Sequence, residues 1–273
     1  MPPPGYEPFL AAILNAPDDD FPRGIYADWL EEQNHCARAE FIRLQCQLAS
    51  LGYPWMQSPH RFPRTPKNTL VASLFARQAE LWQQHATEWQ AEYPTIPGTR
   101  LYWGRGFPGW AVMEHPGGMM KLGATLYQVA PVCRISTQGQ AAAWIREPIE
   151  KADWFLYVRE LIIVFPPGES MEGDEIAASL ARSPRTTGLR ELQLARCDLS
   201  DLGIAELARS PVLGQLRRAD FTGNRIGNEG AMHLLEKLSP DHLRELNLTQ
   251  NPILPVYRRR LLERFGPRIR FDT

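Results

Sequence analysis

Apolar residues recur with a fixed spacing in the last third of the chain. In Leu189–Leu199, leucine occupies the first, fourth, sixth and eleventh positions, and Cys197 occupies the ninth. The same spacing returns 27 residues later in Leu216–Ile226 and another 27 residues later in Leu243–Ile253, with asparagine in the ninth position. The alternation of apolar and polar residues around the fourth to sixth positions predicts a short strand with one buried face in each copy.

A helix is predicted between each strand and the next. Residues 199–210 and 226–239 carry apolar residues at helical spacing, and Ser200 and Asn228 are good N-cap candidates. The apolar residues are Leu202, Ala205, Leu207, Ala208, Ala231, Leu234, Leu235 and Leu238. The spacing in the three copies matches the L-x-x-L-x-L-x-x-[N/C]-x-L pattern of leucine-rich repeats. One strand and one full helix per period indicate the curved horseshoe of ribonuclease-inhibitor-like repeats.

The period extends beyond the three clear repeats with more degenerate matches. Further strands are expected near residues 132 and 158, and a last strand is expected over Ile269–Phe271. The repeats would then fill residues 132–273. An array of repeats leaves apolar surface open at its ends, so residues 96–131 are predicted to form a linker and an N-terminal cap.

Residues 1–95 predict a small helical module. Helices are expected over Glu7–Asn15, from Phe21 onward, over 37–51 and over 68–92. The run Asp18–Asp20, followed by a proline in the first turn, is typical of a helix start. We expect this module to pack against the repeats and to form one body with them.

Two strings in this module carry a family resemblance. Tyr26–Glu32 (Y-A-D-W-L-E-E) and Glu40–Gln45 (E-F-I-R-L-Q) resemble the bacterial repeat-companion domain, which is found at the N-terminus of bacterial proteins with leucine-rich or other repeats. The resemblance implies an interaction protein and brings no reaction with it. The expected fold class is therefore α/β, with an N-terminal helical module capping a short leucine-rich-repeat horseshoe that has a parallel concave sheet.

Composition narrows the function classes. The 30 basic and 31 acidic residues leave a formal net charge of −1, which argues against a general polyanion binder. The chain contains no run of about 18 apolar residues, and its first residues lack the basic start and apolar core of a signal peptide. Its 4 cysteines have neither disulfide-framework nor zinc spacing. We therefore expect a cytoplasmic protein with reduced thiols and no membrane contact.

Two further motifs could carry chemistry, and each has a simpler structural explanation. Gly104–Gly109 spells G-x-G-x-x-G, but Pro108 and the lack of a suitably placed acidic residue favour a turn between two strands over a dinucleotide site. Asp18–Asp20 and Asp28 lack the spacing of a calcium loop. A structural role for Asp28, with its carboxylate bonded to a helix end or to Arg43, is preferred to metal binding.

His35 and Cys36 form a neighbouring His–Cys pair. A cysteine nucleophile needs a base directed at it, and adjacent residues rarely point at one another, so a turn between helices is preferred to a hydrolase site. No G-x-S-x-G, H-E-x-x-H or P-loop string is present. The sequence thus predicts no enzyme, no catalytic residue, no metal and no cofactor.

Arginines crowd the C-terminal segment, where Arg258, Arg259, Arg260 and Arg264 lie near Tyr257. A basic cluster with aromatic residues can bind a phosphate backbone, so a nucleic-acid-associated subunit is the alternative function. A solvated final helix, whose last-turn cations suit the helix dipole, explains the same residues without a ligand.

The exposed positions of the predicted strands give the best candidate site. They are mixed in charge and rich in hydrogen-bonding groups, which suits a partly polar protein interface, although a merely solvated face is also consistent with them. These positions are Glu191, Gln193, Arg218, Asp220, Thr222, Glu245, Asn247 and Thr249. We therefore predict a non-catalytic adaptor or regulatory subunit that binds another protein through the concave face.

Overall fold

The computed structural model describes residues 2–53, 69–114, 123–138, 145–164 and 172–272, which fall into two compact units. Of the described residues, those within 1–96, 100–112 and 122–133 belong to the N-terminal unit, and those within 97–99, 113–121 and 134–273 belong to the C-terminal unit.

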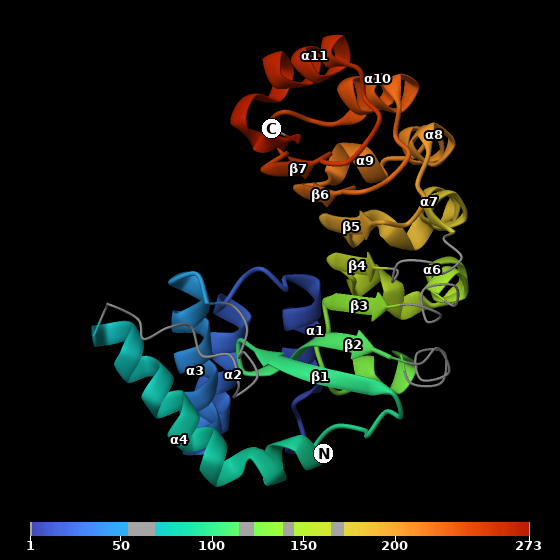
Figure 1. Cartoon of the computed structure of the whole chain (residues 1–273). Coiled ribbons are helices and arrows are strands. Elements are labelled where there is room, and N and C mark those ends of the chain that lie inside the picture. The colour runs from blue at the N-terminus through green and yellow to red at the C-terminus, as the bar shows by residue number, and fades with distance from the viewer. Residues whose placement is uncertain (1, 54–68, 115–122, 139–144, 165–171, 273) are drawn as a thin grey trace. The chain divides into compact units, whose positions relative to one another are not determined.

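The N-terminal unit contains the predicted helices α1 to α4 and all but one end residue of each of the strands β1 and β2 (Figure 1). The four predicted helices are confirmed, and the ends that were predicted for them agree with the described ends to within one residue. No end was predicted for the second helix, and Asn68, where the fourth was expected to begin, lies outside the described residues. The bounds are α1 Glu7–Asn15, α2 Phe21–Glu32, α3 Cys36–Ser50, α4 Thr69–Ala91, β1 Thr99–Gly104 and β2 Phe107–Met113. The helices bury a core that includes Ile13, Tyr26, Leu30 and Ile42.

The start of α2 differs from the expected cap. Asp20 is the N-cap residue but accepts no capping bond, whereas Asp19 Oδ1 accepts a hydrogen bond from the backbone N–H of Phe21 at 2.9 Å. Asp20 Oδ1 lies 2.8 Å from Nε of Arg105, in the turn between β1 and β2. The aspartate run therefore begins the helix through Asp19 and holds the β1–β2 turn through Asp20.

A buried arginine lies at the centre of the N-terminal unit. Arg38 is only 5% exposed, and its Nη2 donates to the hydroxyl of Tyr93 at 3.0 Å and lies 3.7 Å from the carboxylate of Glu92. Its guanidinium lies over the rings of Trp89 and Trp103, at 5.0 and 4.7 Å from their centroids. Aromatic faces and a carboxylate together compensate the burial of this charge.

The G-x-G-x-x-G string is a hairpin turn, as predicted. Arg105 and Gly106 both have positive φ, at 53° and 89°, which is the backbone of a type I′ turn between β1 and β2. The N–H of Gly106 donates to Oε1 of the buried Gln45 at 2.6 Å. A side chain at Gly106 would collide with Ile42. The glycine therefore serves close packing of the turn against α3.

The C-terminal unit is a parallel sheet with helices on one side (Figure 1). Each strand pairs in parallel with the next, so the two degenerate strands and the last strand predicted from the sequence are confirmed. Figure 1 shows the helices of this unit along an outer arc and the strands along the inner one. The strands are β3 Arg134–Gln138, β4 Glu160–Val164, β5 Glu191–Ala195, β6 Arg218–Asp220, β7 Glu245–Asn247 and β8 Ile269–Arg270.

Helices follow the strands of this unit. The α-helices are α6 Arg146–Lys151, α7 Gly173–Arg182, α8 Asp201–Ala208, α9 Val212–Gln215, α10 Asn228–Lys237 and α11 Pro255–Phe265. Short 3₁₀ segments occur at η2 Asp153–Tyr157, η3 Pro184–Gly188 and η4 Gly266–Arg268. The fold class predicted from the sequence, an α/β repeat array with a helical N-terminal part, is confirmed.

The strand leucines form the core between the sheet and the helices. Leu192, Leu194, Leu246 and Leu248 are buried, as the pattern predicts. One helix position was wrong, because Leu202 in α8 is 73% exposed. The inner face of α8 is occupied by other residues, including Ile204 and Leu207.

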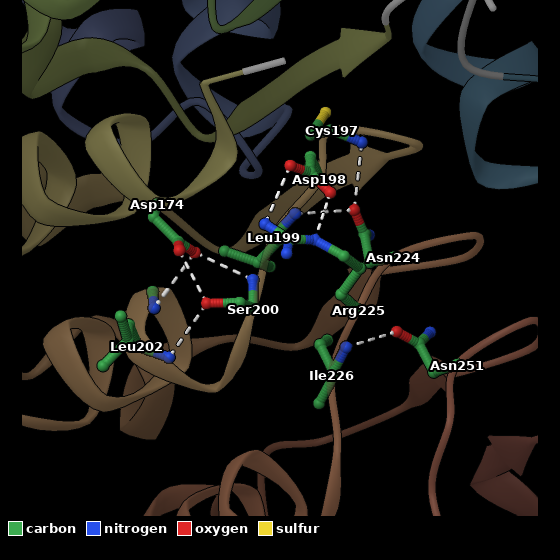
Figure 2. Close-up of polar contacts among 11 residues, drawn as sticks. Asp174, Cys197, Asp198, Leu199, Ser200, Leu202, Asn224, Arg225, Ile226 and Asn251 are labelled. Carbon is green, nitrogen blue, oxygen red and sulfur yellow. Dashed lines mark hydrogen bonds and ion pairs between the residues drawn. The ribbon is translucent and has the colours of Figure 1, made fainter.

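The starts of α8, α10 and α11 are bonded to the first turn of the main helix in the repeat before. Asp174 Oδ1 accepts from the backbone N–H groups of Ser200 (2.8 Å) and Gly203 (3.1 Å), and Figure 2 shows Asp174 beside Ser200 and Leu202. Asp201, 27 residues later, accepts in the same way from Gly227 and Gly230. A Cβ atom at Gly203 would collide with Asp174, which explains the glycine there.

The two predicted N-caps have different outcomes. Ser200 is confirmed, since its Oγ accepts from the N–H of Leu202 at 3.2 Å. Asn228 as a cap was wrong. It is the first residue inside α10, and its Oδ1 accepts from the N–H of Leu254 at 3.0 Å. Asn228 therefore continues the inter-repeat series begun by Asp174 and Asp201, one period further along.

Candidate functional site

A buried polar residue fixes the turn after each strand of the clear repeats. Oδ1 of Asn224 accepts from the N–H groups of Cys197 (2.9 Å) and Leu199 (3.0 Å) (Figure 2). Its Nδ2 donates to the carbonyl of Leu194 at 2.6 Å. Asn251, one period later, accepts from the N–H of Ile226 at 3.0 Å. These bonds satisfy turn groups that the strands leave unpaired, and they are the structural role of the ninth position of the pattern.

Cys197 takes the same position in the first clear repeat. It is buried, and its Sγ lies 3.5 Å from the carbonyl oxygen of Ile163, to which the thiol donates. Burial raises the pKa of the Cys197 thiol to about 12. The thiol therefore stays protonated at neutral pH and acts as a turn residue rather than as a nucleophile.

The turns hold a sheet whose exposed face carries two rows of side chains. Buried and exposed positions alternate along each strand. The parallel pairing then places the exposed residues of neighbouring strands side by side, in equal register. The first row is Glu160, Glu191, Arg218 and Glu245 across β4 to β7, and the second is Ile162, Gln193, Asp220 and Asn247. We call this surface the sheet face.

Ion pairs run across the first row of the sheet face. Arg218 lies 2.7 Å from Glu191, and Arg270 lies 2.9 Å from Glu245. At the other end, Arg134 of β3 lies 3.2 Å from Glu160. These pairs are partly exposed, so each contributes only about 0–1 kcal/mol to stability, and their main effect is to order the side chains.

One pair in the row carries like charges. Glu160 and Glu191 occupy the same register on β4 and β5. Burial raises the pKa of the Glu160 carboxyl to about 7, the charge of Glu191 adds to the rise, and Arg134 and Arg218 oppose it. Glu160 therefore changes charge close to neutral pH.

Hydrogen bonds order the second row and the residues that follow it. Asp220 Oδ1 accepts from the hydroxyl of Thr222 at 2.6 Å, and Asn247 Oδ1 accepts from the hydroxyl of Thr249 at 2.9 Å. The two hydroxyls lie 3.1 Å apart. All four side chains are thus held in place before any ligand binds.

The sheet face contains a hollow of about 190 Å³. Six of the eight residues predicted for the face line it, and Thr222 and Thr249 adjoin it through Asp220 and Asn247. The lining residues are Glu160, Ile162, Glu191, Leu192, Gln193, Arg218, Ala219, Asp220, Glu245 and Asn247. Sequence reasoning missed Glu160 and Ile162, although the degenerate strand expected near residue 158 carries both.

The C-terminal arginines divide into two groups. Arg258 donates through Nε to the carbonyl of Ile253 at 2.8 Å, and its guanidinium lies 5.5 Å from the ring centroid of Phe271, so it holds the end of the array. Arg259, Arg260 and Arg264 are exposed on α11. Three of the four arginines considered for polyanion contact are therefore on the surface.

The structure shows where the remaining candidate motifs lie and which contacts they make. Asp28 Oδ1 accepts from Nη2 of Arg43 at 2.7 Å, as one of the two structural alternatives predicted. His35 and Cys36 lie at the start of α3, where His35 is the N-cap residue. Within the described part of the chain, no three His, Cys, Asp or Glu residues are grouped to hold a metal ion. Nor does any described helix have the length and apolar character needed to cross a membrane.

Comparison with known families identifies part of the repeat array. A family model described as "Leucine Rich repeat" matches residues 187–208 and 216–235. The chain contains two leucine-rich repeats. They include β5, α8, β6 and most of α10, and therefore the centre of the sheet face. Repeats of this type are commonly protein-interaction modules, because stacking creates an extended concave binding surface. A search of curated proteins found no match.

Proposed function

We propose that this protein is a non-catalytic adaptor or regulatory subunit that binds another protein through the sheet face. The observation that carries the proposal is the hollow lined by Glu191, Gln193, Arg218 and Asp220, at the centre of the two leucine-rich repeats. Ordered polar groups around a concave surface suit a partly polar protein interface.

The rigidity of the sheet face supports this proposal. The turns after β5 and β6 are fixed by the buried Asn224 and Asn251, and the starts of α8 and α10 are fixed by the carboxylates of Asp174 and Asp201. A surface that is already ordered loses little side-chain entropy on binding. We also propose that the protein is cytoplasmic and that its N-terminal unit is a repeat-companion domain.

Charge changes on the sheet face test the proposal against nucleic-acid binding through α11. We expect Arg218→Glu together with Glu245→Arg to weaken partner binding by at least about 1 kcal/mol per residue, since interface energy is concentrated in a few central positions. The measurement is quantitative mass spectrometry of proteins that co-purify with the tagged full chain from its native cell, followed by an affinity titration of the strongest partner.

The matched control replaces Arg259, Arg260 and Arg264 with glutamine and leaves Arg258 in place, because Arg258 bonds the backbone. This triple variant should retain the partner. If it loses its binding while the sheet-face variant keeps it, and nucleic acid co-purifies with a steep salt dependence, the working surface is α11 and the proposal is wrong.

A further inference from the structure

The hollow on the sheet face has more carboxylates than cations. Glu160, Glu191, Asp220 and Glu245 line it, together with the single guanidinium of Arg218. Arg134 and Arg270 reach Glu160 and Glu245 from the flanking strands β3 and β8. In the part of the chain that the structure describes, Arg218 is therefore the one cation that lines the middle of the hollow, around Glu191 and Asp220.

Among the described residues, the carboxylate of Asp220 has hydrogen-bond donors but no ion-pair partner. The described residues that contact its carboxylate are Thr222, which donates to Oδ1, and Asn247, whose Nδ2 lies 3.5 Å from Oδ2. Arg218, the nearest arginine along the strand, is paired with Glu191 at 2.7 Å. The charge of Asp220 is therefore not neutralised by any of the described residues.

The like-charged pair Glu160 and Glu191, beside Asp220, also favours a cation at this place. Glu160 and Glu191 share a register on strands that lie about 4.8 Å apart, and like charges placed directly opposite are unfavourable. Arg134, Glu191 and Arg218 are the charged groups that face Glu160 from β3, β5 and β6. Burial raises the pKa of Glu160 to about 7; Glu191 adds to the rise, and the two arginines oppose it. An added cation at this point would relieve the repulsion.

The arrangement of the carboxylates in the hollow favours a cationic side chain over a bare metal ion. The carboxylates come from separate strands, and within the described residues they are not grouped closely enough to hold a metal ion. A guanidinium has five donors in a planar fork, and an ammonium has three, so either can reach several carboxylates at once. Ile162 offers an apolar wall for the methylene stem of such a side chain.

We propose that the hollow receives a lysine or arginine side chain of a partner protein, seated between Glu160, Glu191 and Asp220. This inference rests on the proposed function and specifies the chemistry of its partner. A nucleic acid does not fit this surface, because its phosphates would be repelled by the four carboxylates.

A selection from a random-peptide library displayed on phage tests the inference with a defined probe. The full chain is the bait, and the variant Gln193→Trp, which fills the hollow without changing its charge, is used for counter-selection. We expect the peptides that bind only the unmodified hollow to share a lysine or an arginine. Replacing that residue with glutamine should weaken binding of the peptide about tenfold or more, which corresponds to about 1.4 kcal/mol.

Substitutions in the protein provide the second measurement. Glu191→Gln should weaken binding of the selected peptide about tenfold, whereas the matched change Glu175→Gln, at an exposed position on α7, should leave it unchanged. Affinity should rise as the pH is raised through about 7, because Glu160 then loses its proton, and this dependence should disappear in Glu160→Gln.

The possible failures are distinguishable. If the peptides that bind the hollow lack a basic residue, or tolerate its replacement, the inference about the partner is wrong and the proposed function stands. If no peptide distinguishes the unmodified chain from Gln193→Trp, the sheet face is not a docking surface and the proposed function falls as well.

Discussion

Replacing Asn224 with alanine should lower the free energy of unfolding by roughly 2–6 kcal/mol, because two buried N–H donors lose their acceptor and each such loss costs about 1–3 kcal/mol. The donors are the backbone N–H groups of Cys197 and Leu199. Two further bonds, from Nδ2 to the carbonyls of Leu194 and Phe221, are lost at the same time. Equilibrium denaturation in urea measures the change.

The control for this prediction is Asn247→Ala on the neighbouring strand. Asn247 is half-buried on the sheet face, and its Oδ1 serves only Thr249, so the expected loss is about 1 kcal/mol or less. Equal losses in the two variants would mean that Asn224 is not specially required, and the account of the turns would then be wrong.

Replacing Leu194 with alanine should also cost about 2–5 kcal/mol, the usual range for a buried leucine, because the cavity it leaves cannot fully collapse. Leu194 is fully buried between β5 and the helices. The change also lies beside the Asn224 side chain, which donates to the Leu194 carbonyl. The midpoint and slope of urea denaturation give the value.

Leu202→Ala provides the matched leucine control. Leu202 is 73% exposed in α8, so its truncation should change the free energy of unfolding by no more than about 0.5 kcal/mol. A loss at Leu202 as large as that at Leu194 would show that the helix is packed differently from the structure described above.

Much of the C-terminal unit could be predicted because one spacing rule repeats. The strand leucines, the ninth-position Asn and Cys, and the exposed residues between the leucines all follow from the period and the alternation of a strand. The degenerate strands were found by the same spacing. Glu160 and Ile162 were nevertheless missed as site residues, since the pattern around them has no ninth-position Asn or Cys to mark it.

Other features could not be predicted from the sequence of a single repeat. Asp174, Asp201 and Asn228 bond to the repeat that follows, so their role appears only when neighbouring repeats are stacked. Leu202 satisfies helical spacing and is still exposed, because Gly203 is needed beside Asp174. Arg38 gives no sign of burial in the sequence, since the rings around it come from distant segments.

Site-specific photo-crosslinking in the native cell tests most directly whether the sheet face binds a protein. A photoreactive amino acid is placed at Gln193 in the hollow, at the exposed Met232 on α10, or at Arg260 on α11. We predict that the probe at 193 captures a discrete protein, which is absent when the probe is at 232 or 260. Capture from position 232 or 260 with none from 193 would contradict the proposed binding face.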